Sequence, residues 1–249
     1  MNLWHGLVVF VSAFLAGMIN SVAGGGTLLA FPALLWMGVD PLRANVTCTV
    51  ALWPGSLGGL YGFRREMSGS RRWIALLIWP SIVGALSGAF LLLVTPARIF
   101  AAVVPYLILF ATILFAVGEP LAKRLSGFES NRWRTGAVVF QFFVAVYGGY
   151  FGAGIGILML AALGLLGMSD IYQMQGLKNL LAMCINDVAA IYFMVMGPVI
   201  WTDTFVMAGG AILGGYGAAG LARRLGRTFL RRVVIVIGLA LAASLLLQK

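Results

Sequence analysis

Long hydrophobic blocks separated by short polar stretches make up almost the whole sequence. The blocks cover residues 7–37, 42–63, 73–94, 99–117, 136–167, 171–197, 204–222 and 229–247. Most of them are about 20 residues long, the length that an α-helix needs to cross a hydrocarbon core of ~30 Å. The pattern therefore predicts an all-α polytopic membrane protein with eight segments.

The first and fifth blocks are too long for one crossing, and each has a glycine cluster near its middle. An unbroken helix over residues 7–37 would extend for about 46 Å at about 1.5 Å per residue. The clusters "AGGG" and "GGYFGAGIG" disfavour helix because glycine is a poor helix former. We therefore expect two broken, re-entrant helical hairpins, whose arms of about 11 to 14 residues reach only the middle of the membrane.

The two halves of the chain resemble each other weakly over their full length. A shift of 129 residues pairs Gly25 with Gly154, and a shift of 130 pairs Gly84 with Gly214. The one long hydrophilic stretch lies between the halves. The pattern thus predicts an N-terminal membrane repeat over 1–117, a cytoplasmic linker over 118–134 and a C-terminal membrane repeat over 135–249.

The basic residues indicate how the long blocks lie. If all eight blocks cross once, nine basic residues fall on one side and seven on the other, which is no bias. If the fifth block is a hairpin, the loops 64–72, 118–134 and 223–232 share one side with thirteen basic residues, against three on the other. The positive-inside rule favours the hairpin. Repeat symmetry extends it to the first block, and the two four-segment repeats are then inverted.

Composition excludes several function classes. Hydrophobic residues make up 61% of the chain and charged residues 10%, whereas soluble domains have an apolar fraction of ~45–50%. The formal charge of +10 does not indicate nucleic-acid binding, because the basic residues lie between apolar blocks, next to lipid headgroups. We find no metal-ligand cluster, acid pair or nucleophile elbow, so we expect no enzyme, no metal and no cofactor.

The glycine tips are candidates for a binding site, because non-helical backbone at membrane depth must line a cavity or be surrounded by protein. The second arms should start near Thr27 and Gly156, where free N–H groups and the positive helix dipole favour an anion. The candidate tip residues are Gly24, Gly25, Gly26, Thr27, Gly154 and Gly156. The alternative is that these glycines only allow close helix packing.

The next block in each half carries a polar stripe on an otherwise apolar helix. The first stripe is Asn45, Thr49 and Ser56, and the second, 130 residues later with the same spacing, is Gln175, Asn179 and Asn186. Each set falls within about 40° of arc at about 100° per residue, so both stripes should face inward. They either line the substrate path or form interhelical hydrogen bonds.

Two ionisable residues lie inside the sixth block. Lys178 shares the second stripe, and a buried ammonium marks a pathway by default, although its side chain could instead snorkel to the interface. Asp187, nine residues later, points elsewhere on the helix. It could carry a coupling proton or accept hydrogen bonds as a structural partner.

Several long motifs resemble the sulfite exporter TauE/SafE family of membrane permeases. They are "NSVAGGGTLLAFPALL", "RANVTCTVALWPGSLGGLYGFRRE", "GAGIGILMLAALGLLGMSDIYQMQGLKNLLAMCINDVAAIYF" and "LARRLGRTFLRRVVIVIGLAL". The resemblance implies a bacterial inner-membrane protein of two repeats that moves sulfite, organosulfonates such as sulfoacetate, or related small anions. By matching motif it implies roles for Gly24 to Thr27, Asn45, Thr49, Ser56, Gly154, Gly156, Lys178, Asn179 and Asn186. Where the family pattern has "NATNTVAL" and "NALKN", this chain has "NVTCTVAL" and "QGLKN", so Cys48 and Gln175 bear on substrate preference.

The sequence therefore predicts a secondary transporter for small sulfur-containing anions that works by alternating access. Its expected partners are a small anionic substrate and the lipid bilayer, not nucleic acid. A passive anion channel and an assembly partner for other membrane proteins are the alternatives. The sequence leaves the anion, the direction of transport, the coupling ion and a homo-oligomeric state open.

Overall fold

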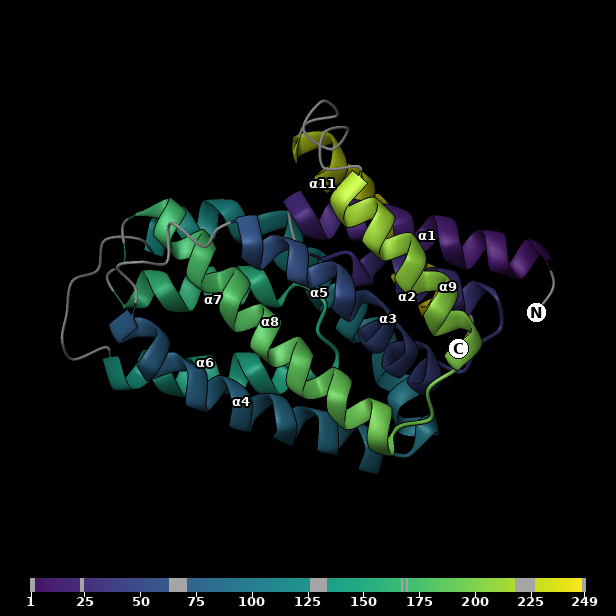
Figure 1. Ribbon diagram of the computed structural model, residues 1–249, viewed down its shortest axis with the longest axis horizontal. Helices are drawn as coiled ribbons and strands as arrows, with labels where there is room; N and C mark the ends of the chain where they lie inside the picture. Colours follow the sequence, from purple (N-terminus) through teal and green to yellow (C-terminus); the bar gives the residue numbers. More distant parts are fainter. Residues whose placement is uncertain are drawn as a thin grey trace.

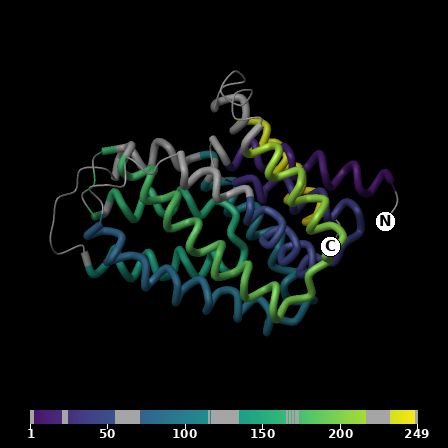
Figure 2. The backbone as a smooth tube through the Cα atoms, viewed as in Figure 1, coloured from purple at the N-terminus to yellow at the C-terminus, as the bar shows by residue number. Residues whose placement is uncertain are grey.

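The computed structural model describes residues 3–22, 25–62, 71–125, 134–166, 168, 170–217 and 227–247, which form a bundle of helices (Figures 1 and 2). The elements are α1 (Leu3–Val22), α2 (Thr27–Trp36), α3 (Pro41–Gly62), α4 (Arg71–Val94), α5 (Ala97–Leu125), α6 (Arg134–Tyr150), α7 (Ile155–Leu165), α8 (Ile171–Met196), α9 (Trp201–Ile212), the π-helix η2 (Leu213–Gly217) and α11 (Arg227–Leu247). These described residues include no strand. The predicted all-helical fold is therefore confirmed.

The helices follow the hydrophobic blocks closely. Counting only the described residues, four helical stretches are long and apolar enough to cross a membrane: Leu3–Asn20, Arg71–Val94, Ala97–Leu114 and Gln173–Met196. Shorter apolar helices accompany them, among them α2, α7 and most of α6 and α11. This composition is that of a multi-pass membrane protein.

Helix α5 is longer than its hydrophobic block. The block ends at residue 117, whereas α5 continues to Leu125 and so enters the stretch expected to be a linker. The added turns include "LAKRL", and alanine, leucine, lysine and arginine are all good helix formers. The hydrophobic pattern predicts which part of a helix contacts lipid. It does not predict the residue at which the helix ends.

Both oversized blocks are broken at their glycine clusters, as expected. The first gives α1 and α2, with 20 and 10 residues, and the second gives α6 and α7, with 17 and 11. The first arm of each hairpin exceeds the expected length of about 11 to 14 residues, in part because α1 and α6 begin before their hydrophobic blocks. The expectation of two short arms is thus wrong for α1 and α6.

The long arm of each hairpin packs against a helix of the other half. Helix α1 lies beside α9 and η2, and α6 lies beside α4 (Figure 1). Glycines bring the backbones into contact, as small residues do in membranes. The contacts pair Gly210 with Phe10, Gly214 with Phe14, Gly84 with Phe142 and Gly88 with Val146. In each helix pair the residue numbers of the two contacting helices increase in the same direction, so both pairs are parallel.

Helices α3 and α8 pass each other in opposite directions in the middle of the bundle. Gly197, just after α8, packs against Val46 near the start of α3. Farther along α3, the indole N–H of Trp53 donates a hydrogen bond to Asp187, which precedes Gly197 in the chain. Helix α8 therefore begins at the end of the bundle where α3 ends.

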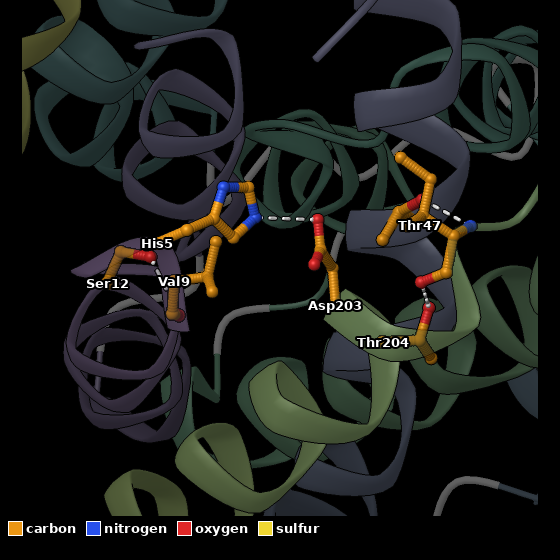
Figure 3. Close-up of polar contacts among 7 residues, drawn as sticks. His5, Val9, Ser12, Thr47, Asp203 and Thr204 are labelled. Atoms are coloured by element: carbon orange, nitrogen blue, oxygen red, sulfur yellow. Dashed lines mark hydrogen bonds and ion pairs between the residues drawn. The ribbon is translucent and has the colours of Figure 1, made fainter. Parts of the chain in front are cut away.

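Polar contacts join the start of α9 to α1 and α3 (Figure 3). His5 Nε2 lies 3.1 Å from Asp203 Oδ2, and the Asp203 side chain is 5% exposed. The backbone N–H of Ile200 donates to Thr47 Oγ1 at 3.1 Å, and the Thr204 hydroxyl donates to the Ile200 carbonyl oxygen at 2.9 Å. The first two contacts join the start of α9 to α1 and α3, and the third is local to the start of α9.

Candidate functional site

A cavity of about 120 Å³ lies where the two hairpins meet α3 and α8. From the first half it is lined by Asn20, Gly25, Thr27, Thr49, Leu52 and Trp53. From the second half come Phe151, Gly152, Gly154, Ile155 and Gly156 of the hairpin, and Lys178, Asn179, Ala182, Met183 and Asn186 of α8. Pockets for drug-sized ligands occupy ~300–1,000 Å³, so this cavity fits a much smaller molecule.

The cavity lies halfway along the two helices that carry most of its side chains. Thr49, Leu52 and Trp53 are close to the middle of α3, and Lys178 and Asn186 bracket the middle of α8. Because a helix of about 20 residues crosses a hydrocarbon core of ~30 Å, we expect this position to lie near the centre of the bilayer. A polar cavity at that depth is costly unless it serves a function.

A side chain builds the tip of the first hairpin. Asn20, near the end of α1, accepts a hydrogen bond from the Gly26 N–H through Oδ1 at 2.7 Å. Gly25 has φ 98, in the left-handed region that glycine adopts readily. A Cβ atom on Gly26 would lie 2.2 Å from the Ala16 carbonyl oxygen, so only glycine lets α2 start this close to α1.

Glycines and a tyrosine build the tip of the second hairpin. Gly152 and Gly154 have φ 79 and 80, which reverses the chain between α6 and α7. The Tyr147 hydroxyl donates to the Ala153 carbonyl oxygen at 2.8 Å and so ties the tip to α6. The first two N–H groups of α7, at Ile155 and Gly156, have no carbonyl partner earlier in their own helix, and both residues line the cavity.

The two hairpins touch each other beside the cavity. The ring of Phe31 on α2 packs edge-on against the ring of Phe151, with centroids 5.5 Å apart, and both side chains are buried. Such an edge-to-face contact is a favoured aromatic arrangement. The contact joins the middle of α2 to the tip of the second hairpin.

Lys178 brings a buried cation to the cavity. Its side chain is only 8% exposed, and a Cβ atom on Gly156 would lie 3.3 Å from Lys178 Cδ. The lysine stem therefore lies along the backbone of α7, close to its first turn. This placement adds the ammonium charge to the positive end of the α7 dipole.

The chemistry of the cavity favours an anion. Its polar groups are the Lys178 ammonium, the amides of three asparagines and the hydroxyls of Thr27 and Thr49, and the described residues that line it include no carboxylate. The Thr49 hydroxyl donates to the Asn45 carbonyl oxygen at 2.9 Å, so the Thr27 hydroxyl is the one offered to an anion. Amide N–H₂ and hydroxyl groups can donate hydrogen bonds to anionic oxygens. In the described part of the chain, no group of three or more His, Cys, Asp or Glu side chains could hold a metal ion.

Most of the site residues proposed from the sequence come together here. The structure places Gly25, Thr27, Thr49, Gly154, Gly156, Lys178, Asn179 and Asn186 on the cavity wall. Gly24 and the side chain of Ser56 lie outside the described residues. The roles of the eight lining residues in transport stay predictions.

Other residues proposed from the sequence do not line the cavity. Asn45 is fully buried, and its Nδ2 donates to the Tyr150 carbonyl oxygen at 2.9 Å, so it joins α3 to the second hairpin. Gly26 is buried with its N–H committed to Asn20. Gln175 is half-buried and away from the wall. Asp187 also lies off the wall and accepts a hydrogen bond from Trp53.

Several lining residues were not among the main site residues predicted from the sequence. Asn20 is a weaker candidate from the sequence because it lies near the first tip, and its role as the acceptor of the Gly26 N–H depends on the fold of the hairpin. Trp53 follows Thr49 by four residues, so the helical period alone places it on the same face of α3. The apolar Phe151 and Met183 carry no polar signal in the sequence.

Comparison with known proteins identifies the relatives of the chain. The family described as sulfite exporter TauE/SafE matches residues 9–245. A probable membrane transporter protein of Haemophilus influenzae is 29% identical over 97% of this chain and 94% of its own length. The probable membrane transporter protein YfcA of Escherichia coli K12 is 29% identical over 96% of this chain and 88% of its own. A probable membrane transporter protein of Sinorhizobium sp is 26% identical over 96% of this chain and 91% of its own. No solved structure gives a significant match.

Proposed function

Because this chain belongs to the sulfite exporter TauE/SafE family of membrane transporters, we propose that it carries small sulfur-containing anions across a bacterial inner membrane. The proposed substrates are sulfite, sulfoacetate and other organosulfonates. The proposed mechanism is alternating access between two inverted halves.

The observation that carries this proposal is the cavity at the meeting of both hairpin tips. Its wall combines the Lys178 ammonium with amide and hydroxyl donors and, among the described residues, no carboxylate. An anion leaving water needs these donors to replace its hydration shell. A sulfur oxyanion or sulfonate has three oxygen acceptors on one centre, which matches a small cavity with donors on several sides.

Helix directions support the inverted arrangement. Eight single crossings would make α3 and α8 parallel, whereas a re-entrant fifth segment makes them antiparallel. The contacts of Val46 with Gly197 and of Trp53 with Asp187 fit the antiparallel pair. A site at the interface of two inverted repeats, near the middle of the membrane, is typical of secondary transporters.

The membrane potential sets the direction in which transport needs coupling. A monoanion gains or loses ~2.3 kcal/mol per 100 mV of potential. With the inside negative, export of the anion proceeds down the electrical gradient, and accumulation inside the cell requires a coupled ion. Asp187 is the residue that the sequence suggests as a proton carrier.

Counterflow in proteoliposomes tests the proposal. Purified protein is reconstituted, the vesicles are loaded with unlabelled sulfite, sulfoacetate, sulfate or acetate, and entry of the labelled anion is followed. We expect saturable entry that is stimulated by internal sulfite or sulfoacetate, with little response to acetate. Flux that never saturates, with no stimulation by internal anion, would indicate a passive channel. Exchange of none of these anions would contradict the proposal.

A further inference from the structure

Trp53 forms part of the cavity wall and is held by a residue outside it. The indole lies on α3, one helical turn after Thr49, and both residues line the cavity. Its Nε1–H donates to the Asp187 carboxylate on α8. The hydrogen bond therefore joins the two helices that carry most of the cavity side chains, and it joins the two halves of the chain.

Asp187 does not reach the cavity itself. The lining residues of α8, from Lys178 to Asn186, cover about 140° of the helix surface at about 100° per residue. On the same scale Asp187 lies about 180° from Lys178 and about 13 Å farther along the helix axis. The carboxylate is therefore directed past the edge of the cavity towards α3, where it meets the indole.

The chemistry of the indole explains why this acceptor matters. A tryptophan N–H that leaves water without gaining another acceptor is costly, and the Asp187 carboxylate is the acceptor here. A carboxylate is the strongest acceptor that a side chain offers, because the hydrogen bond is charge-assisted. With its N–H bonded to Asp187, the indole presents its ring to the cavity and cannot turn its N–H towards a bound anion.

We propose that Asp187 is a positioning residue, which holds the Trp53 indole as a fixed wall of the anion cavity, and that Trp53 sets the fit of the anion. This inference rests on the proposed function. It gives Asp187 a role that does not require it to take up and release a proton during transport.

The substitution Asp187→Asn separates the two roles, because the amide oxygen still accepts the indole N–H but cannot carry a proton. For a positioning residue, counterflow with Asp187→Asn keeps its KM within about threefold and keeps the pH profile of the unmodified protein. Loss of flux, or a pH profile that becomes flat, would overturn the proposal in favour of proton transfer.

Removal of either partner of the hydrogen bond should weaken anion binding. Asp187→Ala and Trp53→Phe should each raise the KM about tenfold, with the turnover number within about threefold, as expected for one lost hydrogen bond. The matched control Trp79→Phe changes a side chain that is 69% exposed on α4, and it should leave the KM unchanged. An unchanged KM in both Asp187→Ala and Trp53→Phe would overturn the inference.

A measurement without substrate keeps this inference distinct from the proposed function. Apparent melting temperatures in detergent are compared for Trp53→Phe, Asp187→Ala and the double variant. If the residues act as a pair, the double variant melts close to the single variants, whereas additive losses would overturn the link. If the unmodified protein exchanges no anion, the proposed function fails, and this cycle still decides whether the pair exists.

Discussion

The two hairpins turn by different means. In α1–α2, the side chain of Asn20 accepts the N–H of Gly26 and closes the tip from within the hairpin. In α6–α7, Gly152 and Gly154 both have positive φ, and Tyr147 ties the tip to its own arm. Both tips contain glycine with positive φ, but at the first tip a side chain accepts a backbone N–H, whereas at the second tip a side chain donates to a backbone carbonyl oxygen.

The equivalent positions around the tips also carry different residues. The shift of 129 that pairs the glycines places Thr27 opposite Gly156, and the shift of 130 places Cys48 opposite Lys178. Cys48 is fully buried, whereas Lys178 lines the cavity and lies along Gly156. In this predicted pairing, the second half has glycine where the first has threonine, and lysine where the first has cysteine. The cation at the cavity therefore comes from the second half.

The largest expected effect comes from removing that charge. Lys178→Met keeps an unbranched side chain of similar size but deletes the ammonium, so a bound anion loses its buried countercharge. We expect the KM for counterflow to rise about a hundredfold or more, which corresponds to at least ~2.7 kcal/mol. The control is Arg98→Ala, which removes an exposed cation at the start of α5. Equal KM values for Lys178→Met and Arg98→Ala would show that Lys178 does not bind the anion.

The next largest effect is expected on stability, at the tip of the first hairpin. Gly26→Ala places a Cβ atom 2.2 Å from the Ala16 carbonyl oxygen, and overpacking of this kind costs about 2–3 kcal/mol. The apparent melting temperature should then fall by roughly 5–10 °C.

Two further glycine variants are compared with Gly26→Ala. Gly154→Ala meets no atom closer than 3.6 Å, but it must adopt φ 80, which costs about 1–2 kcal/mol. Gly209→Ala has nothing within 4 Å and serves as the control. If Gly154→Ala destabilises more than Gly26→Ala, steric contact does not govern the first tip.

Asn20 allows charge and hydrogen bonding to be separated at the first tip. Asn20→Asp keeps an acceptor for the Gly26 N–H and adds a negative charge at the cavity wall. We expect the melting temperature to stay within about 2 °C, while the KM rises about tenfold through repulsion of the anion. Asn20→Ala loses the acceptor and should show the opposite pattern, with a lower melting temperature and a smaller change in KM. An unchanged KM for Asn20→Asp would mean that the anion does not approach the first tip.

The smallest effect concerns the space that Gly156 leaves for Lys178. In Gly156→Ala the new Cβ atom would lie 3.3 Å from Lys178 Cδ, so the flexible stem shifts by a few tenths of an ångström. We expect the KM to rise about two- to threefold with little change in stability. In the Lys178→Met background the same substitution should change the KM less. Equal changes in both backgrounds would show that Gly156 acts independently of the lysine.

Local rules predicted the helices and the breaks in the hairpins well. The glycine clusters indicated the breaks before Thr27 and Ile155 because glycine is a poor helix former, although Gly148 and Gly149 of the second cluster lie inside α6. The helical period likewise placed Lys178, Asn179 and Asn186 on one face of α8, and all three line the cavity.

The sequence could not show what faces each polar residue. Asn45 and Thr49 share one stripe of α3, yet Thr49 lines the cavity while Asn45 bonds the Tyr150 carbonyl oxygen across the bundle. The partners Trp53 and Asp187 are 134 residues apart. Such pairings depend on how the halves pack, and a one-dimensional pattern does not contain that information.

The most direct test of the central claim asks whether both hairpin tips face one anion. Cys48 and Cys184 are replaced by alanine, and single cysteines are introduced by Thr27→Cys at the first tip or Ile155→Cys at the second. The rate of modification by a small thiol reagent is measured in proteoliposomes at increasing sulfoacetate concentration. We expect sulfoacetate to slow both reactions with the same half-maximal concentration. Protection of only one cysteine, or of neither while transport continues, would contradict a shared site.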